Sequence, residues 1–343
     1  MSPARAIGGV MSAEPTGAPV AGSLWEGWSR PFEHFAAFET ARSALAALLR
    51  AHGISRAWLP AYVCASLAAG AAAGAAQVAY YETDFSLTPL LATLAAQLQA
   101  GDAVVIVDYF GRARPDLWGA LIAQRPDILW VEDRAQALDP NAAPLAPSVI
   151  YSPRKLVGVG DGGILFARAP VPQPSAPHDA SRWGPEEARS NDPNGLRPER
   201  WYPLFRAREE GFAPGPGSAS PRTLNALQRL SIARIGRARR RNWGRLAKAL
   251  PEHALWPDRE PDFAPLAFPI LVRDAAAAVG ALAEARIWAP RHWADLPSDP
   301  HRFEAAHRLA AHCVSLPCDQ RYGEADMARL AKAVLEGVAP YPR

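Results

Sequence analysis

Cysteine is scarce in this chain, and its few cysteines are not spaced for a metal site or a disulfide framework. The 343 residues include three cysteines, Cys64, Cys313 and Cys318, and no Cys-x-x-Cys pair. An odd number of scattered cysteines argues against a disulfide scaffold and a zinc knuckle. We therefore expect no metal site and a reducing compartment, the cytoplasm.

Long apolar runs and a strong charge of one sign are also missing. The most apolar stretch, residues 61–80, is interrupted by glycines and polar residues. It lacks the Leu and Ile density of a membrane span and is expected to form a buried helix. Residues 1–30 contain no signal-peptide core, and we expect a flexible tail there. The formal net charge of +3 is too small to indicate nucleic-acid binding, but it suits anionic small molecules.

What the chain does have is a large apolar fraction, 49%, arranged in alternating strand-like and helix-like segments from residue 35 to residue 165. Strands such as "DAVVIVDYFG" and "DILWVEDRAQ" are apolar on both faces, which predicts a mainly parallel sheet covered by helices. We therefore predict an α/β fold with a large domain over residues 31–240. A small α+β domain is expected over residues 241–343.

Two segments of the second half differ from this pattern. Residues 169–217 are rich in Pro, Gly and charge, and we expect an irregular segment near a dimer interface or the substrate mouth. Residues 220–250 predict one long helix or a broken pair, and the arginines of residues 237–245 are expected to form a solvated helix face.

The residues most suggestive of chemistry follow two neighbouring strands. Asp133 ends "DILWVED", with Gln136 three residues later, and Lys155 follows the next strand, three residues after Ser152. The carboxyl ends of parallel strands meet at one edge of a sheet, where ligands bind. A helix N-cap is an equally good interpretation of the acid when it is taken alone.

A lysine paired with a carboxylate is the arrangement that a pyridoxal phosphate enzyme needs. The amine forms a Schiff base with the cofactor, and the carboxylate keeps the pyridine nitrogen protonated. The cofactor's phosphate needs amides at a helix start, which "ETARSA" offers at Ala41, Arg42 and Ser43. The glycines of "GVGDGG" lack the order of a mononucleotide-binding loop and are expected to allow close backbone packing.

Five segments in order resemble the DegT/DnrJ/EryC1/StrS sugar aminotransferases: "ARSALAALL", "LPAYVCAS", "VEDRAQAL", "YSPRKLVGVGDGG" and "CVSLPCDQRYGEADMARL". The likeness spans residues 35–340. It implies the fold of type I pyridoxal phosphate enzymes, with a seven-stranded, mainly parallel sheet and a small C-terminal domain. It also implies a homodimer with active sites at the interface, and an aminotransferase that moves an amino group from glutamate to a nucleotide-linked keto-sugar, as in polysaccharide or antibiotic sugar biosynthesis.

The resemblance also implies a role for each site residue. Lys155 is the Schiff-base lysine, Asp133 the pyridinium partner and Gln136 a contact near the cofactor's phenolic oxygen. Ser152 is expected to hold the phosphate with Ala41, Arg42 and Ser43 at the helix start, and Tyr62 is the nearest aromatic for stacking on the ring. Weaker substrate candidates are His292, Tyr109 and Arg222.

This chain departs from the family's pattern at several positions. Family members commonly have Ser-Gly-Thr where this chain has Thr40-Ala41-Arg42, and five residues from serine to lysine where it has three. The Asn-x-Arg segment that reaches the neighbouring subunit's phosphate is matched only by Ser220-Pro221-Arg222. Two alternatives therefore stay open: another pyridoxal phosphate reaction or an amino-acid substrate, and a family member that binds cofactor or sugar nucleotide without turnover.

Overall fold

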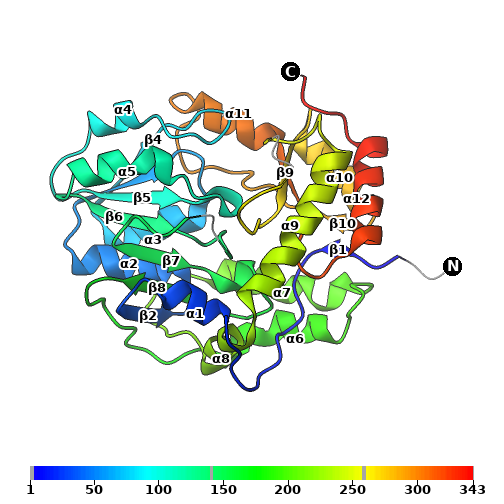
Figure 1. The fold of residues 1–343 in the computed structure, drawn as a ribbon, viewed down its shortest axis with the longest axis horizontal. Coiled ribbons are helices and arrows are strands. Elements are labelled where there is room, and N and C mark those ends of the chain that lie inside the picture. Colours follow the sequence, from blue (N-terminus) through cyan, green and yellow to red (C-terminus); the bar gives the residue numbers. More distant parts are fainter. Residues whose placement is uncertain (1–3, 140–141, 257–259, 343) are drawn as a thin grey trace.

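A seven-stranded sheet forms the core of the large domain, on the left in Figure 1. The computed structural model describes residues 4–139, 142–256 and 260–342. The strand order is β2-β8-β7-β6-β5-β3-β4, and only β8 runs antiparallel to its neighbours. This confirms the predicted α/β fold with a mainly parallel sheet. The strands are β2 (His34–Phe38), β3 (Arg56–Pro60), β4 (Gln77–Tyr81), β5 (Ala103–Val107), β6 (Leu129–Asp133), β7 (Ser148–Tyr151) and β8 (Gly163–Ala167).

The register of the sheet fixes where polar residues leave it. Asp133, the last residue of β6, lies between Val107 of β5 and Ile150 of β7. Lys155 comes five residues after Ile150 in the chain, at the end of the short 3-10 turn η2 (Pro153–Lys155). The carboxyl ends of β6 and β7 therefore deliver both residues to the same edge of the sheet.

Helices α2 (Ala41–Ala51) and α3 (Ala65–Gly74) pack closely on each other beside the sheet. A Cβ at Gly70 or Gly74 would come within 2.8 Å of the α2 backbone, at Arg42 and Ala46 respectively. The glycines of residues 61–80 therefore allow two helix backbones to approach. Only residues 65–74 of this stretch are helical; residues 61–64 connect β3 to α3, and β4 begins at Gln77. The shorter elements of this half are α4 (Leu91–Ala95), η1 (Tyr109–Gly111) and α5 (Pro115–Gln124).

The small lobe forms on the other side of helix α9 (Ile232–Ala249), which follows α8 (Pro221–Arg229) as a broken pair (Figure 1). Strands β9 (Phe268–Leu271) and β11 (Cys313–Leu316) pair antiparallel. Helices α10 (Ala275–Glu284), α11 (Glu304–His312) and α12 (Glu324–Gly337) surround a core that includes Trp243, Phe268 and Leu330. No helix in the described ranges is long and apolar enough to cross a membrane.

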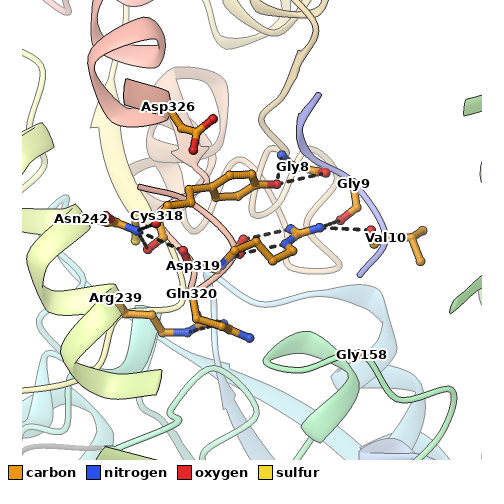
Figure 2. Close-up of polar contacts among 12 residues, drawn as sticks. Gly8, Gly9, Val10, Gly158, Arg239, Asn242, Cys318, Asp319, Gln320 and Asp326 are labelled. Carbon is orange, nitrogen blue, oxygen red and sulfur yellow. Dashed lines mark hydrogen bonds and ion pairs between the residues drawn. The ribbon is translucent and has the colours of Figure 1, made fainter. Parts of the chain in front are cut away.

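The expectation of a flexible tail over residues 1–30 is wrong for the residues from Ala6 onward. Strand β1 (Ile7–Gly8) pairs parallel with β10 (Ile287–Trp288) of the small lobe, and Ile7 is buried. Figure 2 shows Gly8, Gly9 and Val10 beside the loop of Cys318 and Asp319. The Gly8 amide donates to the Tyr322 hydroxyl at 2.6 Å, and Arg321 donates to the carbonyls of Gly9 and Val10 at 3.3 and 3.1 Å.

Further along the same segment, α1 (Leu24–Ser29) packs on the large domain. The Trp28 ring stacks on Tyr151 at 4.3 Å between centroids, and its indole N–H donates to the Leu138 carbonyl at 2.8 Å. The segment thus contacts both lobes, which composition alone did not indicate because it is rich in glycine and proline.

Two other expectations need correction. Residues 169–217 are not irregular throughout, since they contain η3 (Ala180–Trp183), α6 (Gly184–Ser190), η4 (Pro198–Arg200) and α7 (Tyr202–Gly211). The expected domain boundary at residue 240 falls inside α9. Arg239 of the expected solvated face is fully buried and donates to the carbonyls of Leu156, Pro265 and Leu266, so α9 joins the two lobes.

Candidate active site

Lys155 projects from the turn that follows β7. Its backbone N–H donates to the Ser152 carbonyl at 3.1 Å, which closes the turn begun by Pro153. Within the described part of the chain, its side-chain amine has no hydrogen bond and no carboxylate within 4.0 Å. A lysine that is partly buried and unpaired in this way is available for reaction with a ligand.

Asp133 is an acid close enough to Lys155 for the lysine's charge to act on it. Burial raises the pKa of the Asp133 carboxyl, while the Lys155 charge and the Ala135 N–H oppose that rise. Oδ1 accepts the Ala135 N–H at 2.8 Å, so the carboxylate also stabilises the turn after β6. Asp133 therefore supports the local backbone, much as the N-cap interpretation expected, and also lies near the lysine.

A buried ionic cluster lies next to Asp133. Arg134 Nη2 contacts Glu132 Oε2 at 2.8 Å and its Nε contacts Asp108 Oδ2 at 3.1 Å. Burial raises the pKa of Asp108 to about 7, with the Arg134 charge opposing it. The guanidinium connects the residues that end β5 and β6, and thereby supports the edge of the sheet that holds Asp133.

Gln136 fastens the neighbouring turn η1. Its Oε1 accepts the Phe110 N–H at 2.6 Å. Phe110 has a φ of 55°, in the left-handed region that non-glycine residues rarely adopt. The Tyr109 hydroxyl donates to the Tyr62 carbonyl at 2.5 Å. Gln136, Tyr109 and Tyr62 therefore belong to one network, at the side of the site that faces the small lobe.

His292 of the small lobe comes close to Lys155. Burial and the Lys155 charge lower the pKa of its imidazole to about 4, which leaves it neutral at pH 7. Its Nδ1 lies 2.7 Å from the Ser315 hydroxyl, and its ring makes an edge contact with Phe110 at 6.2 Å. The Tyr62 hydroxyl donates to the His292 carbonyl. The structure thus brings His292, Lys155 and Asp133 together from different segments.

The amino end of α2 is the expected phosphate-binding place. Thr40 caps the helix, since its Oγ1 accepts the Ser43 N–H at 3.2 Å. The Ser43 hydroxyl accepts the Gly215 N–H at 3.1 Å, and Arg42 Nη1 donates to the Phe212 carbonyl at 2.8 Å. Residues 212–215 of the same chain therefore lie against this helix end, beside Ala41, Arg42 and Ser43.

Arg222 is the candidate that the structure does not bring to the site in this chain. It contacts Glu187 Oε1 at 2.5 Å, and its guanidinium carbon lies 3.9 Å from the centroid of the Trp183 ring. Ser152 is buried in the turn before Lys155, and its carbonyl accepts the Lys155 backbone N–H. The hydroxyl's expected phosphate contact stays a prediction.

Sequence reasoning missed Arg154, Glu209 and Phe212, which gather beside Arg42. Arg154 Nη1 contacts Glu209 Oε1 at 2.5 Å, and its guanidinium lies 4.9 Å from the centre of the Phe212 ring. The only signal for Arg154 was its place next to the lysine. Nothing in the order of residues 205–215 indicated that they would return to α2.

A separate hollow lies at another edge of the sheet. It has a volume of about 720 Å³ and is lined by the amino ends of β3, β4 and β6, including Arg56, Gln77 and Leu129. That edge is opposite the one that holds Lys155. Its lining includes Arg56 and the buried Asp102, whose charges are paired with each other at 2.7 Å, and we assign no chemistry to it.

Comparison with solved structures finds the same fold in sugar aminotransferases. A DegT/DnrJ/EryC1/StrS aminotransferase from Brucella abortus is 16% identical, with a TM-score of 0.65 over 93% of this chain and 91% of that one. The aminotransferase TlmJ from Streptoalloteichus hindustanus is 18% identical, with a TM-score of 0.64 over 96% and 98%. The PLP form of the sugar aminotransferase Spr1654 from Streptococcus pneumoniae is 13% identical, with a TM-score of 0.68 over 96% of each chain. No family model and no curated protein matches the sequence.

Proposed function

We propose that this chain is a pyridoxal phosphate-dependent aminotransferase of the DegT/DnrJ/EryC1/StrS family. The observation that carries the proposal is the convergence of Lys155 and Asp133 from the ends of neighbouring strands, in a fold shared with sugar aminotransferases. The unpaired amine of Lys155 suits the aldehyde of the cofactor, and the buried carboxylate of Asp133 suits its pyridine nitrogen. The amides and guanidinium at the start of α2 fit its phosphate.

When bound, the cofactor supplies an electron-withdrawing ring that stabilises negative charge on the substrate carbon. The residues of this chain do the rest. The amine of Lys155 binds the cofactor and then, once released, moves a proton to and from the reacting carbon. The Asp133 carboxylate would hold the protonated ring nitrogen of the cofactor, whose positive charge would offset the burial of the carboxylate.

Two neighbouring residues complete the site. Gln136, held by its bond to the Phe110 N–H, would offer its side-chain amide to the cofactor. His292, neutral and close to Lys155, offers an imidazole that can accept or donate a hydrogen bond to the substrate without repelling the amine. The Tyr62 hydroxyl donates to the His292 carbonyl, and the Tyr109 hydroxyl donates to the Tyr62 carbonyl.

The amino donor in this proposal is glutamate, and the acceptor is a keto-sugar carried on a nucleotide. The likeness to solved sugar aminotransferases supports the sugar, and the basic balance of the chain suits an anionic substrate. We further propose a cytoplasmic homodimer with active sites at its interface, on the strength of the family resemblance.

Absorbance spectroscopy of the purified protein tests the assignment. Wild-type protein mixed with pyridoxal phosphate is expected to develop a visible absorption band, and Lys155→Ala is expected to abolish it. Glutamate should bleach the band of the wild-type protein. A band that resists every amino donor would favour binding without turnover, whereas absence of any band in the wild type would refute the function.

A further inference from the structure

Two guanidinium groups crowd the amino end of α2. Arg42 is the second residue of the helix, and within the described ranges it makes no ion pair; its Nη1 donates to the Phe212 carbonyl. Burial and the charge of Arg154 lower the pKa of Arg42, so the two cations are close. The helix dipole adds positive potential at the same place. Uncompensated positive charge in a partly buried position favours the binding of an anion.

Arg154 is the second observation, independent of the helix. Its side chain is only 10% exposed, and its Nε is buried without a hydrogen-bond partner. One of its other nitrogens, Nη1, contacts Glu209 at 2.5 Å. A buried donor left unpaired is unfavourable, so the guanidinium has hydrogen-bonding capacity that the chain itself does not satisfy.

The nearby arginines already have other carboxylates. Arg182 Nε contacts Glu39 at 2.8 Å, and Arg208 Nη1 contacts Glu186 at 2.6 Å. Glu209, on the last turn of α7 and 28% exposed at its side chain, contacts Arg154 and also lies 3.6 Å from Arg208 Nε, so one carboxylate faces the charges of three arginines, Arg42 included.

Phe212 provides a platform for these cations. Its buried ring lies 5.8 Å from the guanidinium carbon of Arg42, 4.9 Å from that of Arg154 and 4.6 Å from that of Arg182. Stacking against an aromatic face orients a guanidinium and leaves its edge donors free. The donors of Arg154 are thus held in place before any ligand arrives.

We propose that Arg154 and Arg42 form a guanidinium clamp for the phosphate of the cofactor, and that Glu209 occupies the place of this phosphate until it binds. The clamp lies within one chain, at the first amides of α2. A phosphate dianion accepts two parallel bonds from one arginine and carries more charge than the carboxylate that it replaces. This inference rests on the proposed function, because it takes the phosphate to be that of pyridoxal phosphate.

The test compares two aldehydes that differ only in the phosphate. Dissociation constants of pyridoxal 5′-phosphate and of pyridoxal are measured by absorbance on the full chain, as wild type and as Arg154→Met, Arg154→Lys and Glu209→Gln. We expect Arg154→Met to weaken binding of the phosphorylated aldehyde by about 10- to 100-fold, with Arg154→Lys intermediate. Glu209→Gln should tighten it several-fold. Binding of pyridoxal should not change in any variant.

A matched control and an independent probe complete the experiment. Arg206→Met removes an exposed arginine of α7 that is paired with Glu210, and it should change neither constant. Inorganic phosphate should raise the midpoint of thermal unfolding of the wild type but not of Arg154→Met, and this comparison also shows whether that variant folds.

The outcomes separate this inference from the proposed function. Equal loss of both aldehydes in Arg154→Met, or weaker binding of the phosphorylated aldehyde in Glu209→Gln, would overturn the clamp. If the wild type binds neither aldehyde, the proposed function fails, and the phosphate measurement alone decides whether the anion site exists.

Discussion

Gly163 offers the sharpest test of how the large domain holds α2 in place. A Cβ on this residue would lie 2.0 Å from the carbonyl carbon of Thr40, 2.1 Å from its oxygen and 2.2 Å from the Ala41 nitrogen. Carbon atoms in van der Waals contact are about 3.5–4.0 Å apart, so Gly163→Ala requires a shift of roughly 1.5 Å. All three contacts are backbone atoms, and no side-chain rotation can relieve them.

The cost follows from what such a shift would disturb. Gly163 pairs with Phe38 in the sheet, and α2 buries Leu45, Leu48 and Leu49. Overpacking of a close-packed core costs about 1–3 kcal/mol, and a clash with fixed backbone belongs at the upper end. We therefore expect Gly163→Ala to lower the free energy of unfolding by about 3 kcal/mol.

Equilibrium unfolding in urea, followed by circular dichroism and tryptophan fluorescence, measures this loss. Gly119→Ala is the matched control, because no atom lies within 4 Å of its would-be Cβ in helix α5. That change should stabilise the protein by up to about 1 kcal/mol, the helix-propensity difference. Equal unfolding midpoints for Gly163→Ala and the wild type would refute the reasoning from close backbone packing.

Three further changes test other parts of the structure. Trp28→Ala should lower the free energy of unfolding by about 3–5 kcal/mol, because the ring is buried in the core. A loss under 1 kcal/mol in urea unfolding would mean that the segment around Trp28 contributes little to the fold, as expected of a flexible tail. Arg239→Met removes the Arg239 donor from the Pro265 and Leu266 carbonyls, while the Leu156 carbonyl keeps the Gln320 amide, and should cost about 3 kcal/mol. Arg237→Met, on the exposed face, should stay within about 0.5 kcal/mol. For His292, a folded pKa of about 4 against the ordinary 6.5 means that the unfolded state gains its proton first as pH falls. The free energy of unfolding should therefore fall from pH 6.5 to pH 4, and His292→Gln should flatten that slope in unfolding curves taken across the range.

Much of the fold could be predicted because its signals are local. Continuous apolar strands separated by helices predicted the parallel sheet, and the helix starts expected near residues 41 and 220 are confirmed by α2 and α8. Lys155 and Asp133 could be paired in advance, since the carboxyl ends of adjacent parallel strands share an edge. These inferences needed no knowledge of distant contacts.

The expectations that failed depend on contacts between distant residues. Nothing around Ile7 indicates that it pairs with Ile287, because the partner is 280 positions away. The glycines and prolines of the N-terminal segment also make its sequence resemble a loop. Arg239 looked like one more cation of an exposed helix face. It is buried because carbonyls of a loop and of a turn after Lys155 converge on it, which no helical periodicity can show.

The fate of Arg222 and the position of Arg154 bear on the same question, namely which chain supplies the phosphate's cations. The family pattern has an arginine of the neighbouring subunit near that group, but Arg222 is stacked on Trp183 and paired with Glu187 within its own chain. Releasing it would break both contacts. Arg154 needs no such rearrangement, since its orphaned Nε already lies in the turn that carries Lys155. If the clamp is correct, the departures at Thr40-Ala41-Arg42 and at the arginine of α8 form one coordinated change. The cation that others take from a second subunit would be supplied here from within the chain, and the affinity for phosphate should then be the same at protein concentrations below and above any dimerisation constant.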